Sequence, residues 1–269
     1  MTESTEIEAT FPGSVGFVGA GRVARIMLGG WARAARLPGA VLVTDPDPAA
    51  VSALTAAVPS AIVTEVSKAA SADVVFVAVH PPVAVATLTL LRDLVPERSV
   101  VVSLIPSVPL LRVGAELGGN RPLARMIPNA PSIVGAGFNP IAYGPGMTAT
   151  ARADLAALLE PLGAYPEVPD DRLEAYAVLT AMGPTYLWPQ LYALADVGQR
   201  MGLDPGAALD ALVAMVDGAL LTMTDADLTP DEVQDLIPVR PLAEPVAAMR
   251  AAYGEVLTGL HARLTGRGH

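Results

Sequence analysis

Cysteine is absent from this chain of 269 residues, and histidine is scarce. Without cysteine the chain can form neither a disulfide framework nor a catalytic thiolate. The 3 histidines, His80, His261 and His269, stand too far apart in the sequence to predict a zinc site. We therefore expect no metal.

Basic residues are also few. The formal net charge is -10, the sequence pI is about 4.7, and lysine and arginine form no cluster with aromatic residues. A phosphate backbone or an anionic membrane would repel such a chain. We therefore expect no nucleic-acid partner.

A long apolar run able to span a membrane is missing as well. Residues 74–91 come nearest, but the sequence His80-Pro81-Pro82 interrupts them, which a spanning helix tolerates poorly. We interpret them as a buried strand, a loop and a helix. Residues 1–13 are polar and acidic, lack the basic and apolar regions of a signal peptide, and are interpreted as a disordered leader. We predict a cytoplasmic protein that does not bind membranes.

Hydrophobic residues, by contrast, make up 52% of the chain, enough for a sizeable core. In the first half, short apolar runs alternate with helical patterns. Strands with apolar residues on both faces at this spacing are typical of a doubly wound parallel sheet, so we predict an α/β domain. The runs predict strands at residues 15–18, 41–44, 61–63, 74–79, 100–104 and 122–126.

The second half has a different pattern, with alanine- and leucine-rich segments of period near 3.6. We predict an all-α C-terminal domain, with the junction in the Gly- and Pro-containing stretch 143–148. The division is then a leader at 1–13, a nucleotide-binding domain at 14–148 and a helical domain at 149–269. The predicted helices lie at residues 151–162, 170–181, 185–202, 205–222, 230–237 and 244–264.

Residues 207–221 are too apolar to remain on the surface of a monomer. They predict a homodimer formed through the C-terminal helices, with a larger assembly of dimers as a further option.

The stretch GAGRVA at residues 19–24 fits the pattern G-x-G-x-x-A between a predicted strand and a predicted helix. The first glycine permits a tight turn, the second lets the backbone approach a pyrophosphate, and the small third residue allows the helix to lie close to the strand. The helix N-terminus then faces the phosphates. This indicates a Rossmann-type domain with cofactor contacts from Gly19, Ala20, Gly21, Arg22 and Val23.

Asp45 follows the next predicted strand, near the position from which a carboxylate accepts hydrogen bonds from the adenosine ribose hydroxyls. A carboxylate there repels a 2′-phosphate, so we predict NAD(H) as the preferred cofactor. NADP(H) stays an alternative, because Arg22 could reach a phosphate. Asp45 could also simply begin the turn DPDP.

Four stretches resemble the pyrroline-5-carboxylate reductase family: GFVGAGRVA, VFVAVHPP, RMIPNAPSIVGAG and AMGPTYLWPQLYALADVGQRMGLD, with its GP-x-Y helix start. They occur in the family's order over roughly residues 15–219. The resemblance implies an NAD(P)H-binding Rossmann domain, a helical domain that dimerises by intertwining, and hydride transfer to a cyclic imine. It also implies that His80 and Pro81 lie beside the cofactor, and that Asn129 lies near the nicotinamide.

The sequence departs from the family's pattern at several places. His80 replaces the usual lysine, and it could equally be hydrogen-bonded at a strand end. Tyr192 stands where the family usually has glutamate. The segment S-P-G-G-T-T, which cradles the substrate carboxylate, is replaced by VQDLIPVRPLAEPV at residues 233–246. Because its prolines donate no backbone N–H, we expect Arg240 to hold an anionic group of the substrate instead. A surface arginine in a helix connection is the alternative.

Reduction of a C=N bond needs little beyond positioning and a proton source, since a protonated imine already accepts hydride. We predict an NAD(P)-dependent reductase or dehydrogenase for a small, anionic imine or amino-acid-like substrate, distinct from proline biosynthesis itself. Tyr192 and Tyr186 are the candidate acids, although each could be a buried packing residue. Thr185 is a candidate polar contact, and Gly183 and Pro184 are candidate substrate contacts.

Three other interpretations stay open or are disfavoured. A catalytically silent NAD(P)-binding regulatory protein would keep the glycine loop and lose the substrate loop. A reductase using another hydride carrier, such as a deazaflavin, would share the same loop. The β-hydroxyacid dehydrogenases use a lysine in the second domain, whereas Lys68, the only lysine here, lies in the first. Asp196 and Asp235 are expected to cap or pair at the dimer surface.

Overall fold

The computed structural model describes residues 12–119 and 121–266. Its contacts divide the described chain into two compact units. The first unit runs to Met182 and also includes residues 261–266, and the second unit is Gly183–Leu260. The leader predicted at residues 1–13 lies almost entirely outside the described residues.

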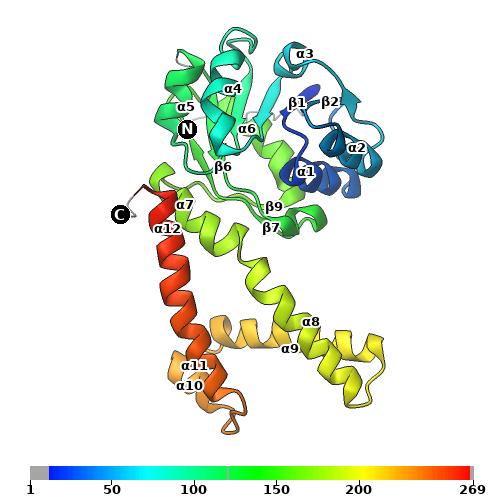
Figure 1. The fold of residues 1–269 in the computed structure, drawn as a ribbon, viewed down its shortest axis with the longest axis vertical. Coiled ribbons are helices and arrows are strands. Elements are labelled where there is room, and N and C mark those ends of the chain that lie inside the picture. Colours follow the sequence, from blue (N-terminus) through cyan, green and yellow to red (C-terminus); the bar gives the residue numbers. More distant parts are fainter. Residues whose placement is uncertain (1–11, 120, 267–269) are drawn as a thin grey trace, which may run out of the picture. The chain divides into compact units, whose positions relative to one another are not determined.

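A seven-stranded sheet forms the centre of the first unit (Figure 1). All its neighbouring strands pair in parallel except the last, β8, which runs antiparallel to β6. The six parallel strands confirm the predicted runs, and the mostly parallel sheet confirms the predicted fold class. The order along the sheet is β3 (Ile62–Val63), β2 (Ala40–Thr44), β1 (Ser14–Val18), β4 (Val74–Val77), β5 (Val100–Ser103), β6 (Leu123–Met126) and β8 (Ile141–Tyr143).

Helices cover both faces of this sheet (Figure 1). Because successive strand residues point to opposite faces, Phe76 joins one buried cluster and Val75 and Val77 join the other. One cluster contains side chains of α1 (Arg22–Arg33), α2 (Pro48–Ala57) and α6 (Ala149–Leu159). The other contains side chains of α3 (Val66–Ala70), α4 (Ala84–Leu91) and α5 (Leu110–Leu117).

The first unit extends beyond the junction expected at residues 143–148. Leu155 and Leu158 of α6 are fully buried in the same cluster as Trp31, and the Trp31 indole Nε1 donates to the carbonyl of Leu158 at 2.6 Å. The sequence predicted α6 as a helix, but the apolar side chains of α6 pack in the core of the sheet domain and not in the helical unit. The remaining short elements are η1 (Pro81–Val83), η2 (Ala130–Val134), β7 (Gly137–Phe138), η3 (Glu160–Leu162), β9 (Gly163–Ala164), η4 (Asp170–Arg172), α7 (Leu173–Tyr176) and the π-helix η5 (Ala177–Ala181).

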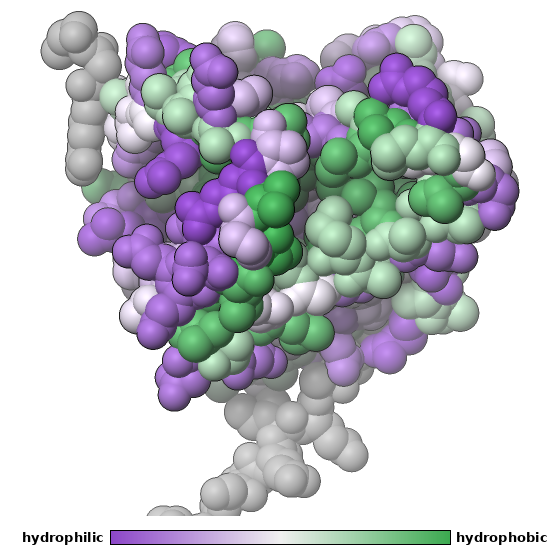
Figure 2. All heavy atoms as spheres, turned by 90° about the horizontal axis from the view of Figure 1, so that it is seen from below, coloured by the Kyte–Doolittle hydropathy of each residue, from purple (hydrophilic) through white to green (hydrophobic). Residues whose placement is uncertain are grey.

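The second unit is helical, which confirms the helices predicted there. Within it only Gly198 and Ala208 are buried. One of its helices, α9, is long and apolar enough to cross a membrane by length and composition alone, with 6% of the apolar window buried. Figure 2 shows broad hydrophobic areas on one face of the molecule. The helices are α8 (Pro184–Arg200), α9 (Pro205–Asp225), α10 (Pro230–Asp235), α11 (Ala243–Ala252) and the π-helix η6 (Tyr253–Leu257), followed by α12 (Thr258–Leu264).

Candidate functional site

The glycine turn follows β1 at the carboxyl edge of the sheet. The Gly19 N–H donates to the Thr44 carbonyl at the end of β2, and the Ala78 N–H donates to the Val18 carbonyl, both at 2.8 Å. The turn therefore lies between the ends of β2 and β4, where the chain's crossover direction reverses along the sheet. In open α/β sheets this switch point is where ligands bind.

The two glycines of the turn differ in the space around them. Gly19 has φ +109°, and a Cβ there would overlap the carbonyl oxygen of Ala78. A Cβ on Gly21 would meet no atom within 4 Å. Gly21 is therefore dispensable for the protein's own contacts, and its bare backbone leaves room for a group approaching α1.

The N-terminus of α1 is open to an anion. No side chain of the described chain caps Gly21, and the first turn of α1 contains no acidic residue. The helix dipole and its first N–H groups favour a negative charge there. Arg22 is exposed beside this end.

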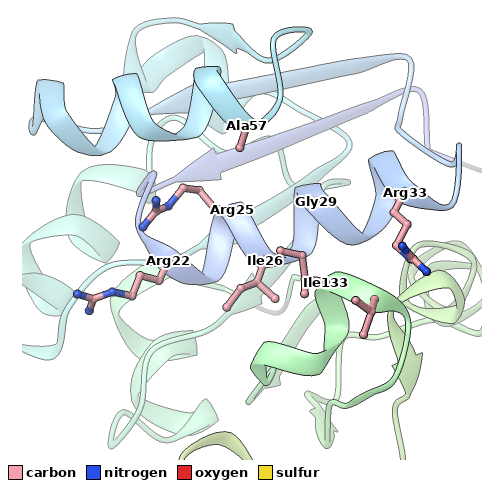
Figure 3. Close-up of a pocket in the computed structure, with 8 residues that line it drawn as sticks. Arg22, Arg25, Ile26, Gly29, Arg33, Ala57 and Ile133 are labelled. Carbon is pink, nitrogen blue, oxygen red and sulfur yellow. The ribbon is translucent and has the colours of Figure 1, made fainter. Parts of the chain in front are cut away.

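An open groove of about 670 Å³ runs along the outer side of α1. Figure 3 shows Arg22 and Arg25 near one end of the helix and Arg33 near the other, with Ile26 and Ile133 between them. The arginines make this groove cationic.

Asp45 joins the glycine turn to the end of β2. One carboxylate oxygen accepts from the Ala20 N–H at 2.7 Å, and the other accepts from the Asp47 N–H at 2.8 Å. Asp45 thus begins the DPDP turn and also holds the glycine turn in place. Its predicted role beside a ribose stays a prediction.

His80 and Pro81 lie just after β4, at the same carboxyl edge as the glycine turn. Both are exposed. Among the described residues, no three His, Cys, Asp or Glu side chains come together in a group that could hold a metal ion.

Asn129 follows β6 and is 8% exposed. Its side-chain oxygen accepts from the Phe138 N–H at 3.0 Å, and its Nδ2 donates to the Thr180 carbonyl at 3.2 Å. The Asn139 Oδ1 accepts from the Asn129 N–H and from the Ser132 hydroxyl. The Asn129 side chain therefore holds its own loop together, a role that sequence reasoning did not identify.

Arg125, Asp170 and Glu174 form an ion cluster, largely buried, that was not predicted from the sequence. Arg125 is fully buried in the middle of β6. The one available signal was an arginine inside the otherwise apolar strand LARM.

The second unit contains the candidate acids. Gly183 and Pro184 begin α8, and Thr185 follows them. The Tyr186 ring lies 6.3 Å from the Tyr253 ring, centroid to centroid, and burial raises the pKa of the Tyr186 phenol. Tyr192 is 70% exposed, so in this unit it is not the buried packing residue of the alternative interpretation.

Arg240 lines a groove of about 410 Å³ within the second unit. Its Nη2 donates to the carbonyl of Gln234 at 2.8 Å, which fixes the guanidinium against α10. Arg250 of α11 lines the same groove, together with Leu242 and Val246. The groove thus combines two cations with apolar walls.

The sheet order, the glycine turn and the open helix N-terminus define a Rossmann-type nucleotide-binding domain. Over residues 14–106 the chain matches the model of a family described as "NADP oxidoreductase coenzyme F420-dependent".

Curated relatives point to one enzyme family. The pyrroline-5-carboxylate reductase of Escherichia coli (strain K12) is 25% identical over 230 residues, covering 83% of this chain and 84% of the relative. That of Methanosarcina acetivorans is 28% identical over 234 residues, covering 83% of each chain. These similarities support the pyrroline-5-carboxylate reductase family for this chain and confirm the resemblance found in its motifs.

Solved structures show the same fold. The Plasmodium falciparum pyrroline carboxylate reductase with NADP bound aligns with a TM-score of 0.76 at 15% identity, over 95% of this chain and 98% of the other. A pyrroline-5-carboxylate reductase from Coxiella burnetii aligns with a TM-score of 0.71 at 21% identity, over 97% and 100%. The Rossmann-like first unit with a helical C-terminal region is therefore the fold of these reductases.

Proposed function

We propose that this protein is an NAD(P)-dependent oxidoreductase that transfers hydride to or from the C=N or CH–NH group of a small, anionic imine or amino-acid-like compound. The observation that carries the proposal is the pair of glycines at the switch point. Gly19 has no room for a Cβ, whereas Gly21 faces open space. That combination suits a pyrophosphate held against the N-terminus of α1.

A nicotinamide dinucleotide supplies the hydride when it is bound. The residues that would hold it are Gly21, Arg22 and Val23 through the first turn of α1, with Asp45 at the adenosine ribose. The Ala20 N–H already donates to Asp45, so the phosphate contacts fall to the N–H groups that follow it. His80 and Pro81 at the end of β4 and the loop of Asn129 after β6 would border the nicotinamide half. The Asp45 carboxylate favours NADH over NADPH.

The second unit would bind and protonate the substrate. Arg240 and Arg250 share one groove, and a guanidinium can hold a carboxylate through two parallel hydrogen bonds. Tyr186 and Tyr192 are the proposed proton donors. A tyrosine phenol is ordinarily protonated at neutral pH, as a proton donor must be. Burial raises the pKa of Tyr186 further, so its phenol stays in the donor form. Thr185, Gly183 and Pro184 would contact the substrate at the start of α8.

We also propose a homodimer built through the helices of the second unit. The side chains of Leu209, Val213 and Leu220 in α9 are each more than half exposed. Soluble monomers rarely expose contiguous apolar side chains of this kind. Asp210 and Asp217 on the same helix are costly in lipid. A second copy of this chain therefore suits α9 better than a membrane.

Two alternatives follow from particular observations. The matched family's description names coenzyme F420, so hydride exchange between a deazaflavin and NADP is the second candidate reaction. The exchanged loop at residues 233–246 is the observation for a silent dinucleotide-binding protein, since it lacks the glycines that cradle a carboxylate.

The test is an assay of NADH and NADPH oxidation with cyclic imines of five- and six-membered rings, each with and without a carboxylate. We expect oxidation that depends on the imine and is fastest for a carboxylated ring other than the substrate of proline biosynthesis. Dinucleotide binding without turnover of any imine would contradict the proposal and favour the silent protein. Turnover only with a reduced deazaflavin would favour the second reaction.

A further inference from the structure

Arg125 is a cation placed in the core of the first unit. It stands in the middle of β6, and its side chain is 0% exposed. Its Nη1 donates to Asp170 Oδ1 at 3.0 Å, and its Nη2 pairs with the Glu174 carboxylate. Arg125 and Glu174 are buried, and Asp170 is partly exposed. Burial of charged groups costs much free energy unless each is paired, and it contributes little net stability even then. The cluster is therefore better explained by what it positions.

The two carboxylates also hold the loop after β5. Glu174 Oε1 accepts from the Ser107 N–H, and Asp170 Oδ2 accepts from the Leu110 N–H, both at 3.0 Å. Ser107 has φ +63°, in the left-handed region that a serine rarely adopts. The bond from Glu174 thus fixes a strained backbone at the carboxyl edge of the sheet.

The loop after β6 is tied to the same helical segment. Glu174 lies in α7, which continues directly into the π-helix η5. The Thr180 carbonyl of η5 accepts from Asn129 Nδ2 at 3.2 Å. Single π-helical turns occur frequently at functional sites. Hydrogen bonds to residues 170–181 therefore hold both loops at this edge of the sheet, the one after β5 and the one after β6.

These loops lie on one side of the switch point, and Asp45 lies on the other. In a doubly wound sheet the carboxylate after the second strand holds the adenosine ribose, so the opposite half of the edge receives the other nucleotide. We infer that Arg125, Asp170 and Glu174 form a positioning cluster that holds the loops of Ser107 and Asn129 in place for the nicotinamide half of the dinucleotide. This inference rests on the proposed cofactor.

The test compares two ligands in one variant. ADP-ribose contains the adenosine half without nicotinamide, and NADH contains both. In Arg125→Met, which keeps an unbranched apolar stem and removes the charged guanidinium, we expect the Kd for NADH to rise by about tenfold or more while the Kd for ADP-ribose changes by less than about twofold. A general loss of folded protein would weaken both ligands equally, so the selectivity separates positioning from stability.

Two further variants complete the design. Glu174→Gln in the Arg125→Met background removes the unpaired buried charge and keeps an acceptor for Ser107, so it should recover part of the NADH affinity. Arg152→Met removes the exposed pair between Arg152 and Glu167, 2.8 Å apart in the same unit, and should change neither Kd. If Arg125→Met does not fold, Glu174→Ala and Asp170→Ala, which remove the acceptors for the Ser107 and Leu110 N–H groups, carry the same selective expectation.

Equal losses for NADH and ADP-ribose, or no loss for NADH, would overturn the inference. Binding of neither ligand by the unmodified protein would overturn the proposed function and the inference with it. Selective loss of NADH in Arg125→Met, with partial recovery in the double variant, would support both.

Discussion

The two units use the same kind of residues in opposite ways. In the first unit, apolar side chains from both faces of the sheet form two large buried clusters, one of which includes Phe17, Trp31 and Phe76. In the second unit, Gly198 and Ala208 are the only buried residues, although its helices are rich in alanine and leucine. The first unit therefore buries its apolar side chains within one chain, whereas the second unit leaves most of its apolar side chains exposed.

This difference separates two requirements. The edge that would hold a dinucleotide is formed by strands whose side chains are buried, so its backbone is fixed before any ligand arrives. The helical unit has no such support within one chain. Its residues are expected to acquire a defined environment only when a second copy covers α8 and α9.

The largest effect is expected where the second unit meets its copy. Replacing both Val213 and Leu220 with aspartate should shift the dimer to monomer, raising the dissociation constant by about a hundredfold or more, because each buried aliphatic side chain contributes about 1.5 to 3 kcal/mol. Light scattering at micromolar concentration measures the mass. Asp217→Asn on the same helix is the control and should leave the dimer intact. A monomeric unmodified protein would contradict the dimer.

The next effect concerns the turn of the first unit. Gly19→Ala should destabilise the fold by roughly 3 kcal/mol, because its Cβ would overlap the Ala78 carbonyl and its φ of +109° is strained for alanine. Gly21→Ala should leave the melting temperature nearly unchanged and weaken NADH binding. Thermal melts with and without NADH distinguish the two variants. Equal melting temperatures would show that the close contact at Gly19 is absent.

The groove of the second unit supplies the third comparison. Arg240→Ala should cost about 1.5 to 3 kcal/mol in substrate binding while sparing the Kd for NADH, because it removes a charge-assisted pair. Arg240→Lys should recover only part, since an ammonium lacks the planar fork. Arg250→Ala should show the same pattern. Arg172→Ala, an exposed arginine of the first unit, is the control. Unchanged KM and kcat in Arg240→Ala would remove Arg240 from the site.

The smallest effect is expected at Asp45. The unmodified protein should bind NADH more tightly than NADPH, and Asp45→Asn should reduce that preference by about tenfold or less, because it removes one charge near the 2′-phosphate. The amide oxygen can still accept from the Ala20 N–H, so folding should be little affected. Titration of both cofactors at fixed salt measures the ratio. Tighter binding of NADPH by the unmodified protein would contradict the prediction and favour Arg22 as the phosphate contact.

The parallel strands could be predicted because their residues are apolar on both faces, as in Val74–Val77. No strand was predicted at β7, β8 or β9, which are two or three residues long and carry no periodic signal. It also placed the domain junction before α6, since the apolar stripe of a helix does not reveal its partner. That partner is Trp31, more than a hundred residues earlier in the chain.

The candidate site was predictable only where its chemistry is local. The turn at Gly19 and Gly21 lies within one strand–helix unit, so a motif describes it. The cluster of Arg125, Asp170 and Glu174 joins residues 45 and 49 positions apart, and only the folded chain brings them together. Arg250 was missed for a related reason. It lies in α11 and Arg240 lies in the turn before α11, and only the folded chain brings both side chains to one groove.

The central claim is that the carboxyl edge of the first unit holds a nicotinamide dinucleotide at the glycine turn. Calorimetric titration of the unmodified protein with NADH tests it most directly. The account predicts saturable binding of one NADH per chain, competed by ADP-ribose and strongly weakened in Gly21→Ala. Absence of heat from NADH and from NADPH, or binding that Gly21→Ala leaves unchanged, would contradict it.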